Sequence, residues 1–405
     1  MLDIELYKEC EQYARPTLPP WHIPTHSYFL FPFDEGFNLT SLPALRVLLN
    51  GGSDADFSAF MEDLGGLSSV ESKQLLSALT DVVRYQQSSF FNAKPVVPVS
   101  NALRYFNIAK KILGINPTAK SLLEIESGLS LLPFALKHTL PQVEMYCSIE
   151  RNSTLYLAQH YINLFLHGKR FDQRLLSQVE ESLYPVEKKE RSAEESAFDP
   201  KPRSPIGVDK SKRAFQIPWW QTGELDRVDL KFDVVVSTSN LQSVDPGALP
   251  TYLDKIKRTL SSDGILFAQG INDTAACYTK PVNPHNLLKG VYEAGFAPLF
   301  IALDSHKKSA PEWKVSKTTE ALDRVRPCKL ACPYMVLITN NHPLFQKYYD
   351  VDNFRDYFCA EEKNIVDTFL CKSDGARSYS QRELAEQLRS DLVAEADTPP
   401  WRSNQ

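Results

Sequence analysis

The feature that most constrains this chain is an alternation, from residue 121 onward, of short apolar runs with amphipathic segments of helical length. Such alternation is typical of β-α-β units, in which crossover helices join parallel strands. Strands are expected at residues 121–125, 144–149, 215–217, 232–237, 264–269, 299–302 and 335–339. Helices between them are expected at residues 129–138, 153–166, 250–260 and 284–294. The pattern predicts an α/β domain over residues 117–342, with a Rossmann-like, doubly wound, mostly parallel seven-stranded sheet.

The segments outside this alternation differ in composition. Residues 1–116 combine Pro-rich loops with helical patterns, and we expect a mostly helical region that acts as a lid over the substrate. Residues 187–213 are charged, Pro-rich and nearly devoid of large apolar side chains, which predicts a surface insertion. A helical extension is expected over residues 343–395, before a flexible tail at 396–405. The helical patterns in these regions cover residues 56–63, 69–85, 102–113, 344–349, 354–370 and 380–392.

Composition argues against several classes of protein. The 405 residues carry a formal net charge of -5, so no overall positive field draws the chain to nucleic acid or an anionic membrane. The longest apolar runs are far shorter than the roughly 20 residues that cross a bilayer, and the sequence starts without a secretory signal. Seven scattered cysteines suit a reducing compartment better than a disulfide framework. We expect a cytoplasmic protein without nucleic-acid or membrane partners; its oligomeric state has no signal in the composition.

The most informative turn follows the first expected strand, which ends near Glu124 and turns through Gly128 into a helix. In a doubly wound sheet this turn lies at the switch point, where ligands bind against the carboxyl ends of the strands. Glycine lets the backbone approach a ligand closely because it has no Cβ atom. The next expected strand ends on Glu150, and an acid there can hold both hydroxyls of a ribose. These features favour a cofactor that contains a nucleoside, although a turn with one glycine and one acid also occurs without a ligand.

This turn resembles the first motif of the class I S-adenosylmethionine-dependent methyltransferases, which runs acid-x-Gly-x-Gly-x-Gly. Glu124 stands at the acid and Gly128 at the central glycine, whereas Glu126 and Ser130 stand at the two flanking glycine positions. A side chain at Glu126 either obstructs the methionine part of the cofactor or places a charge near its sulfonium. The family's later landmarks follow in the same order, at residues 232–244, 252–260, 261–268 and 287–296.

The resemblance implies S-adenosylmethionine as the cofactor and a hydroxylated small molecule as the methyl acceptor. The cofactor-binding residues that it implies are Glu124, Glu126, Ser127, Gly128, Glu150, Ser237 and Ser239. Within the superfamily, the chain also resembles the sugar O-methyltransferases through residues 156–161 and 237–244 and the pattern Tyr252-Leu253-x-x-Ile256. O-methylation of a sugar is therefore the implied reaction.

A sugar hydroxyl is a weak nucleophile, so its methylation needs a base or a metal ion beside the oxygen. The candidates follow the fourth and fifth strands: Asp245, Asn272, Asp273, Tyr278 and His285. His285 is the leading base because a neutral imidazole accepts a proton near pH 7, but a His after Pro284 also fits an ordinary helix start. Asp273 is the second catalytic candidate, or else a ligand of a divalent ion. The sequence has no carboxylate cluster with convincing ligand spacing, so we predict no metal site.

Two other functions stay open on the sequence. A non-catalytic methyltransferase-like scaffold would explain Glu126 and Ser130 as traces of a lost cofactor site. A nicotinamide-dependent oxidoreductase needs the fingerprint Gly-x-Gly-x-x-Gly, of which only Gly128 is present, and it ranks last. The retained Glu124, Gly128 and Glu150 favour the enzyme over the scaffold.

Overall fold

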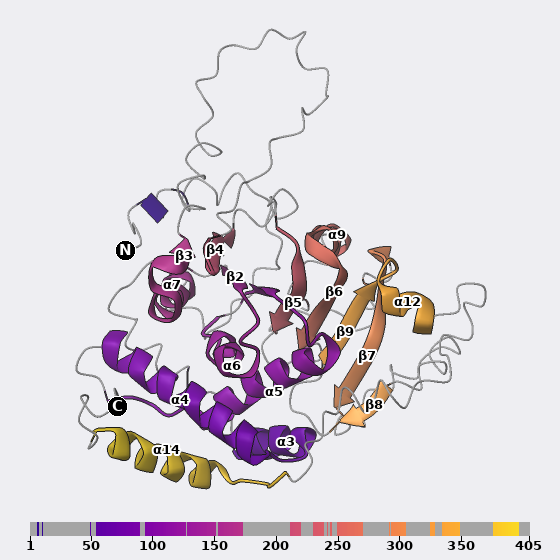
Figure 1. Ribbon diagram of the computed structural model, residues 1–405. Helices are drawn as coiled ribbons and strands as arrows, with labels where there is room; N and C mark the ends of the chain where they lie inside the picture. Colours follow the sequence, from indigo (N-terminus) through magenta and orange to yellow (C-terminus); the bar gives the residue numbers. More distant parts are fainter. Residues whose placement is uncertain are drawn as a thin grey trace, which may run out of the picture.

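A mixed sheet with helices on both faces forms the centre of the chain (Figure 1). The computed structural model describes residues 6–7, 10, 49, 54–89, 94–126, 128–150, 153–172, 211–219, 230–238, 241, 244, 249–269, 291, 293–304, 325–328, 334–348 and 376–396. The strands are β1 (Ser121–Ile125), β2 (Met145–Glu150), β3 (Phe171–Asp172), β4 (Ala214–Pro218), β5 (Phe232–Thr238), β6 (Leu260–Gln269), β7 (Phe296–Asp304), β8 (Val325–Cys328) and β9 (Tyr334–Thr339). The helices are α3 (Asp54–Leu64), α4 (Ser69–Ser89), α5 (Val99–Ile115), α6 (Leu132–Thr139), α7 (Ser153–His167), α9 (Leu249–Thr259), α12 (Pro343–Tyr348) and α14 (Gln381–Ala396).

The strand order of the sheet is β3-β4-β2-β1-β5-β6-β9-β7-β8. All neighbouring strands are parallel except β9, which runs antiparallel to both β6 and β7. Each of the seven expected strands is present, but the described part of the sheet has nine strands because β3 and β8 extend its two edges. β3 has only two residues, too few to leave an apolar run in the sequence.

The central strands are buried on both faces, which explains why their sequences are continuous apolar runs rather than alternating ones. Side chains of a strand point alternately to the two faces. On one face, Leu122 and Val234 pack in a cluster with α3, α4, α5, α6 and α14. On the other face, Leu123 and Val235 pack against the buried side of α9.

The helices that precede the sheet share its core. Leu103 and Phe106 of α5 belong to the same hydrophobic cluster as Leu122 of β1. The amphipathic pattern at residues 102–113 therefore marks a helix that packs on the sheet, and the expected helices at 56–63 and 69–85 are α3 and α4. α14 adds Leu384 and Leu388 to this cluster, so the C-terminal helix completes the same layer.

Several expected helices differ from those observed or fall outside the described residues. α6 begins at Leu132 rather than at residue 129, because the hydroxyl of Ser130 accepts a hydrogen bond from the Leu132 amide (3.0 Å) and holds a turn before the helix. The expected helix at 354–370, the 187–213 insertion except for 211–213, and most of the expected helix at 284–294 lie outside the described residues. No helix in the described ranges combines the length and apolar character of a membrane span.

Candidate functional site

The sheet has its switch point at β1. The chain passes from β1 to β2 on one side and later returns to β5 on the other side, so the connections leave β1 in opposite directions. A crevice forms between such connections at the carboxyl ends of the strands, and it is where open α/β sheets bind ligands. The turn from β1 to α6 and the end of β2 both lie at this edge, where the sequence predicted the cofactor.

The β1–α6 turn is held by hydrogen bonds to β2 and α7. The backbone amide of Glu126 donates to the Ile149 carbonyl (2.7 Å), and that of Gly128 donates to Oε2 of Glu150 (2.7 Å). The Gln159 side chain of α7 donates its amide to the Gly128 carbonyl (2.7 Å). These contacts fix the turn against the end of β2, so the two predicted cofactor residues Gly128 and Glu150 are brought together.

Two residues of this turn adopt the left-handed backbone conformation. Gly128 has φ +56°, where glycine has no steric cost, and Glu126 has φ +51°, where a Cβ atom disfavours the conformation. A Cβ atom built on Gly128 meets no atom of the described residues within 4 Å. Among the described residues nothing fills the space beside the Gly128 backbone, as the predicted approach of the cofactor's methionine part requires.

Glu124 lies under the turn and is completely buried. Its Oε2 accepts a hydrogen bond from the Tyr146 hydroxyl (2.6 Å), while Oε1 has no partner within the described structure. Burial raises the pKa of Glu124 from 4.5 to about 7, and the negative charge of Glu150 adds to this effect. The hydroxyls of Ser130 and Tyr146 and the charge of Arg104 act in the opposite direction. Near neutral pH this carboxyl group is therefore poised between its protonated and charged forms.

Helix α5 contributes side chains to the same edge, which the sequence analysis did not predict. Nε of Arg104 donates to Oε1 of Gln269, the last residue of β6 (2.9 Å). Tyr105 is buried, and burial raises the pKa of its hydroxyl against the opposing charge of Arg104. The side chains of Ser130 and Thr238 lie within hydrogen-bonding reach of the Tyr105 hydroxyl, so α5 reaches the ends of β1, β5 and β6.

A polar stripe on α5 was the signal that could have revealed this role. Arg104, Asn107 and Lys111 recur at helical spacing, and Asn107 and Lys111 are buried. Both bind Asp63 of α3, and the Lys111 ammonium also lies 4.9 Å from the ring centre of Tyr334 in β9. Buried polar groups on an otherwise apolar face need partners, so such a stripe indicates specific contacts.

The remaining predicted site residues divide into two groups. Ser237 lies at the carboxyl end of β5 and is buried, and its hydroxyl has no hydrogen-bond partner within the described ranges. Ser127, Ser239, Asp273 and His285, together with the further candidates Asp245, Asn272 and Tyr278, lie outside the described residues. His, Cys, Asp and Glu side chains form no group suited to a metal ion in the part of the chain that the structure describes.

Comparisons with known proteins return only distant likenesses. No protein-family profile and no curated protein sequence matches the chain. The chain is similar in structure to the pyocyanin biosynthetic protein PhzM, with 11% identity and a TM-score of 0.33 over 60% of this chain and 56% of that protein. The match thus spans just over half the length of PhzM.

Two of the other similar structures are described as methyltransferases. The CcbJ methyltransferase from Streptomyces caelestis has 9% identity and a TM-score of 0.32, over 58% of this chain and 89% of that one. A S-adenosylmethionine-dependent methyltransferase from Clostridium acetobutylicum has 9% identity and a TM-score of 0.30, over 63% and 96%. At these low identities and TM-scores the likeness does not establish a function, which has to be inferred from the residues of the chain itself.

Proposed function

We propose that this chain is a S-adenosylmethionine-dependent methyltransferase that methylates a hydroxyl group of a small molecule such as a sugar. The observation that carries the proposal is the β1–α6 turn, in which Gly128 borders an accessible space and Glu150 is anchored beside it. The turn lies at the switch point of the sheet, where a nucleoside-bearing cofactor is expected.

The proposed roles follow from the position of each group. Gly128 admits the methionine part of the cofactor, and the Glu150 carboxylate holds the ribose hydroxyls. The cofactor supplies a methyl group on a positively charged sulfur. Transfer to the acceptor oxygen then depends mainly on alignment, because an in-line displacement at the methyl carbon needs both partners in contact. His285, or alternatively Asp273, removes the hydroxyl proton.

Helix α5 is proposed to border the acceptor. Arg104 and Tyr105 lie at the same carboxyl edge of the sheet, where Arg104 contacts the end of β6. A guanidinium and a phenol are hydrogen-bonding groups suited to a polyhydroxylated acceptor. In this proposal the expected lid region supplies acceptor contacts from a helix that is packed on the sheet core.

A calorimetric titration with S-adenosylmethionine and S-adenosylhomocysteine tests the cofactor site, with NAD as the control for an oxidoreductase. Binding of the methyl cofactor in the micromolar range, without binding of NAD, supports the proposal. Glu150→Ala is expected to weaken binding by about tenfold or more, since hydrogen bonds to a charged group contribute about 1.5–3 kcal/mol. Glu144→Ala is the matched control, because Glu144 is an exposed acid just before the opposite end of the same strand.

Methyl transfer is tested separately with a panel of hydroxylated acceptors and detection of S-adenosylhomocysteine. His285→Ala should lower the turnover rate by about a hundredfold or more if the imidazole is the general base. An unchanged rate would remove His285 from the reaction, and Asp273→Asn is then the next variant.

A non-catalytic scaffold is the second candidate, and a specific observation favours it. Oε2 of Glu150 already accepts the Gly128 amide, and Glu126 and Ser130 carry side chains at the two glycine positions of the motif. A folded protein that binds neither methyl cofactor in the titration would establish the scaffold and overturn the enzyme.

A further inference from the structure

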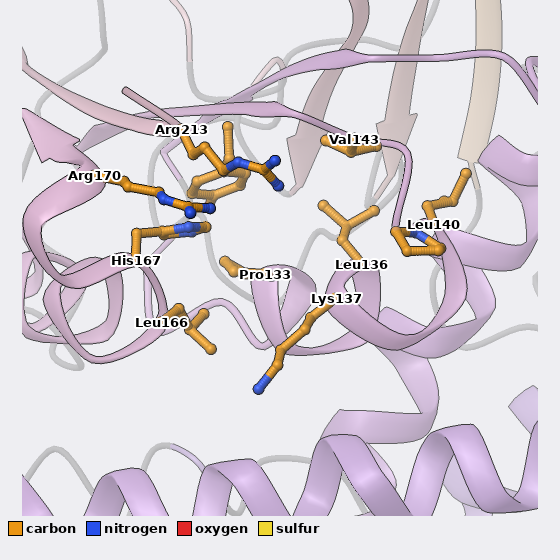
Figure 2. Close-up of a pocket in the computed structure, with 11 residues that line it drawn as sticks. Pro133, Leu136, Lys137, Leu140, Val143, Leu166, His167, Arg170 and Arg213 are labelled. Atoms are coloured by element: carbon orange, nitrogen blue, oxygen red, sulfur yellow. The ribbon is translucent and has the colours of Figure 1, made fainter. Parts of the chain in front are cut away.

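A cavity lies at the opposite edge of the sheet from the Gly128 turn. It is lined by residues next to the amino ends of three strands, with Val143 before β2, Arg170 before β3 and Arg213 before β4, and its volume is about 410 Å³. Its other walls come from α6 and the end of α7 (Figure 2). The volume falls within the roughly 300–1,000 Å³ that is typical of small-molecule sites. This amino-edge pocket contains none of the proposed cofactor residues, although Tyr146, which lines it, donates its hydroxyl to Glu124.

Two arginines are brought together at this pocket by the pairing of β3 with β4. The register pairs Phe171 with Ala214, so the preceding residues Arg170 and Arg213 stand side by side, and the Arg213 amide donates to the Arg170 carbonyl (2.8 Å). Figure 2 shows both guanidinium groups on the same side of the pocket, above Pro133. Within the described structure neither guanidinium has an ion-pair or hydrogen-bond partner. Two adjacent like charges repel, so an anion between them would relieve an unfavourable contact.

Lys137 also lines the pocket, but its ammonium group is paired with an acid on α4. Its ammonium points away from the two arginines in Figure 2 and forms an ion pair with Asp81 of α4 at 2.7 Å. Among the described residues, the positive charges of the pocket that lack an ion-pair partner are therefore those of Arg170 and Arg213.

His167, the last residue of α7, adds an unsatisfied polar atom to the same wall. Its Nε2 is buried and has no hydrogen-bond partner within the described ranges. Burial, together with the charges of Arg213, Lys137 and Arg170, lowers the pKa of His167 to about 4, so the imidazole is neutral near pH 7. A buried nitrogen without a partner is costly, and a ligand oxygen held by the arginines would lie within reach of the ring in Figure 2.

The wall across from the arginines is apolar, which distinguishes this pocket from a site for inorganic phosphate alone. Pro133, Leu136 and Leu140 of the α6 segment and Val143 face the cavity across from the arginines (Figure 2). An inorganic anion alone would leave these side chains in contact with water. A ligand with an apolar body would bury them, with a gain of about 25 cal/mol for each Å².

We propose that the amino-edge pocket binds a small amphipathic anion, with a carboxylate or phosphate group between Arg170 and Arg213 and an apolar body against Leu136 and Val143. Arginine suits both oxyanions because its planar guanidinium can donate two parallel hydrogen bonds. Bound there, the anion would also give the His167 ring a partner. The proposal is independent of methyl transfer, since no residue of the Gly128 turn takes part.

Calorimetric titrations of the full chain with four probes test this site: 3-phenylpropionate, phenyl phosphate, inorganic phosphate and 3-phenylpropanol. The proposal expects at least one of the two aromatic anions to bind at least tenfold more tightly than both inorganic phosphate and the neutral alcohol. The stronger of the two identifies the preferred oxyanion. Equal binding of inorganic phosphate and both aromatic anions would overturn the amphipathic site, and so would the absence of binding by both aromatic anions.

Variants then locate the binding. Arg170→Gln and Arg213→Gln should each weaken the stronger aromatic anion by about tenfold or more, while thermal unfolding without ligand checks that each variant folds. Lys169→Gln is the matched control, because it removes the same charge from an exposed neighbour that does not line the cavity. An equal loss in Lys169→Gln would mean general charge attraction and would overturn the proposal.

A proton NMR titration of the histidines supplies a readout at the site itself. A bound anion should raise the pKa of His167, because negative charge beside the ring favours its protonated form. Arg213, Arg170 and Lys137 are the charged groups that face the ring, and they act in the opposite direction. Saturation with the stronger aromatic anion that leaves the His167 resonance and its titration unchanged would place the anion outside this pocket.

Discussion

Replacing the buried Glu124 by Gln should make the stability of the protein less dependent on pH. In the folded protein burial raises the pKa of this carboxyl group from 4.5 to about 7. Folded chains therefore keep the proton over a range of pH in which unfolded chains have lost it. Because the folded state binds more protons in this range, the free energy of unfolding falls as pH rises from about 4.5 to 7. Gln cannot titrate, so the variant lacks this contribution.

The size of the effect follows from the two pKa values. Linkage between 4.5 and about 7 gives a loss of about 2–3 kcal/mol from the wild type between pH 5 and pH 8 that the variant does not share. The Gln carbonyl can still accept the hydrogen bond from Tyr146. Its amide introduces donors where Oε1 has no partner within the described structure, which lowers the variant's stability by a similar amount at both pH values.

Urea unfolding of both proteins at pH 5 and pH 8 measures the difference. Glu144→Gln is the control, because this exposed acid precedes the neighbouring strand at the opposite edge and should follow the wild type. The expected result is that Glu124→Gln gains about 2–3 kcal/mol on the wild type between the two pH values. If the two proteins lose stability in parallel, Glu124 is charged throughout and the argument from burial is refuted.

Three further variants test the local structure. At Glu126, Gly should give a protein about 1 kcal/mol more stable to urea than Ala, because the left-handed backbone disfavours a Cβ atom, and an advantage for Ala would contradict this conformation. Ser130→Ala should lower the free energy of unfolding by about 1 kcal/mol, because a buried amide at the start of α6 loses its acceptor; an unchanged value would show that the turn does not need the hydroxyl. Burial alone would raise the pKa of Asp81, but hydrogen bonds from His138 and Lys137 outweigh it and lower the pKa below 3.8. Asp81→Asn should therefore be less stable than the wild type by about 1–3 kcal/mol above pH 4, with the difference shrinking in acid as the wild type is protonated; pH-independent stabilities would count against the ion pairs.

The sheet could be predicted because its central strands are buried on both faces. Such strands need continuous apolar runs, and each of the seven runs marked from the sequence is a strand. The sequence did not reveal β3 and β8, because short strands at an edge are held by backbone pairing and leave little pattern. The late start of α6 was missed for a related reason: a single hydrogen bond from the Leu132 amide to the Ser130 hydroxyl outweighed the apolar periodicity.

The positions of the candidate site residues could be predicted where they depend on consecutive residues, but not where they depend on packing. Glu124, Gly128 and Glu150 were expected at one sheet edge because a turn at the end of a parallel strand fixes their place there, while their roles toward a cofactor stay predictions. Arg104 and Tyr105 were not, because their contribution depends on how α5 lies across the sheet, which local sequence does not encode. The same holds for the pairing of Arg170 with Arg213, which 42 intervening residues separate in the chain and the β3–β4 register brings together.

The left-handed Glu126 bears on the choice between an enzyme and a scaffold. If glycine alone fixed the course of this turn, replacing two glycines of the motif would be expected to change it. Here the turn keeps its left-handed residues because hydrogen bonds from Glu126 to Ile149 and from Gly128 to Glu150 hold the backbone, at a steric cost of about 1–2 kcal/mol for Glu126. The missing glycines therefore do not imply a lost backbone cradle. The Glu126 side chain is what still bears on the choice. Glu126→Gly should lower cofactor affinity if its charge lies beside the sulfonium of a bound cofactor, and should raise affinity, or create measurable binding, if the side chain obstructs the site.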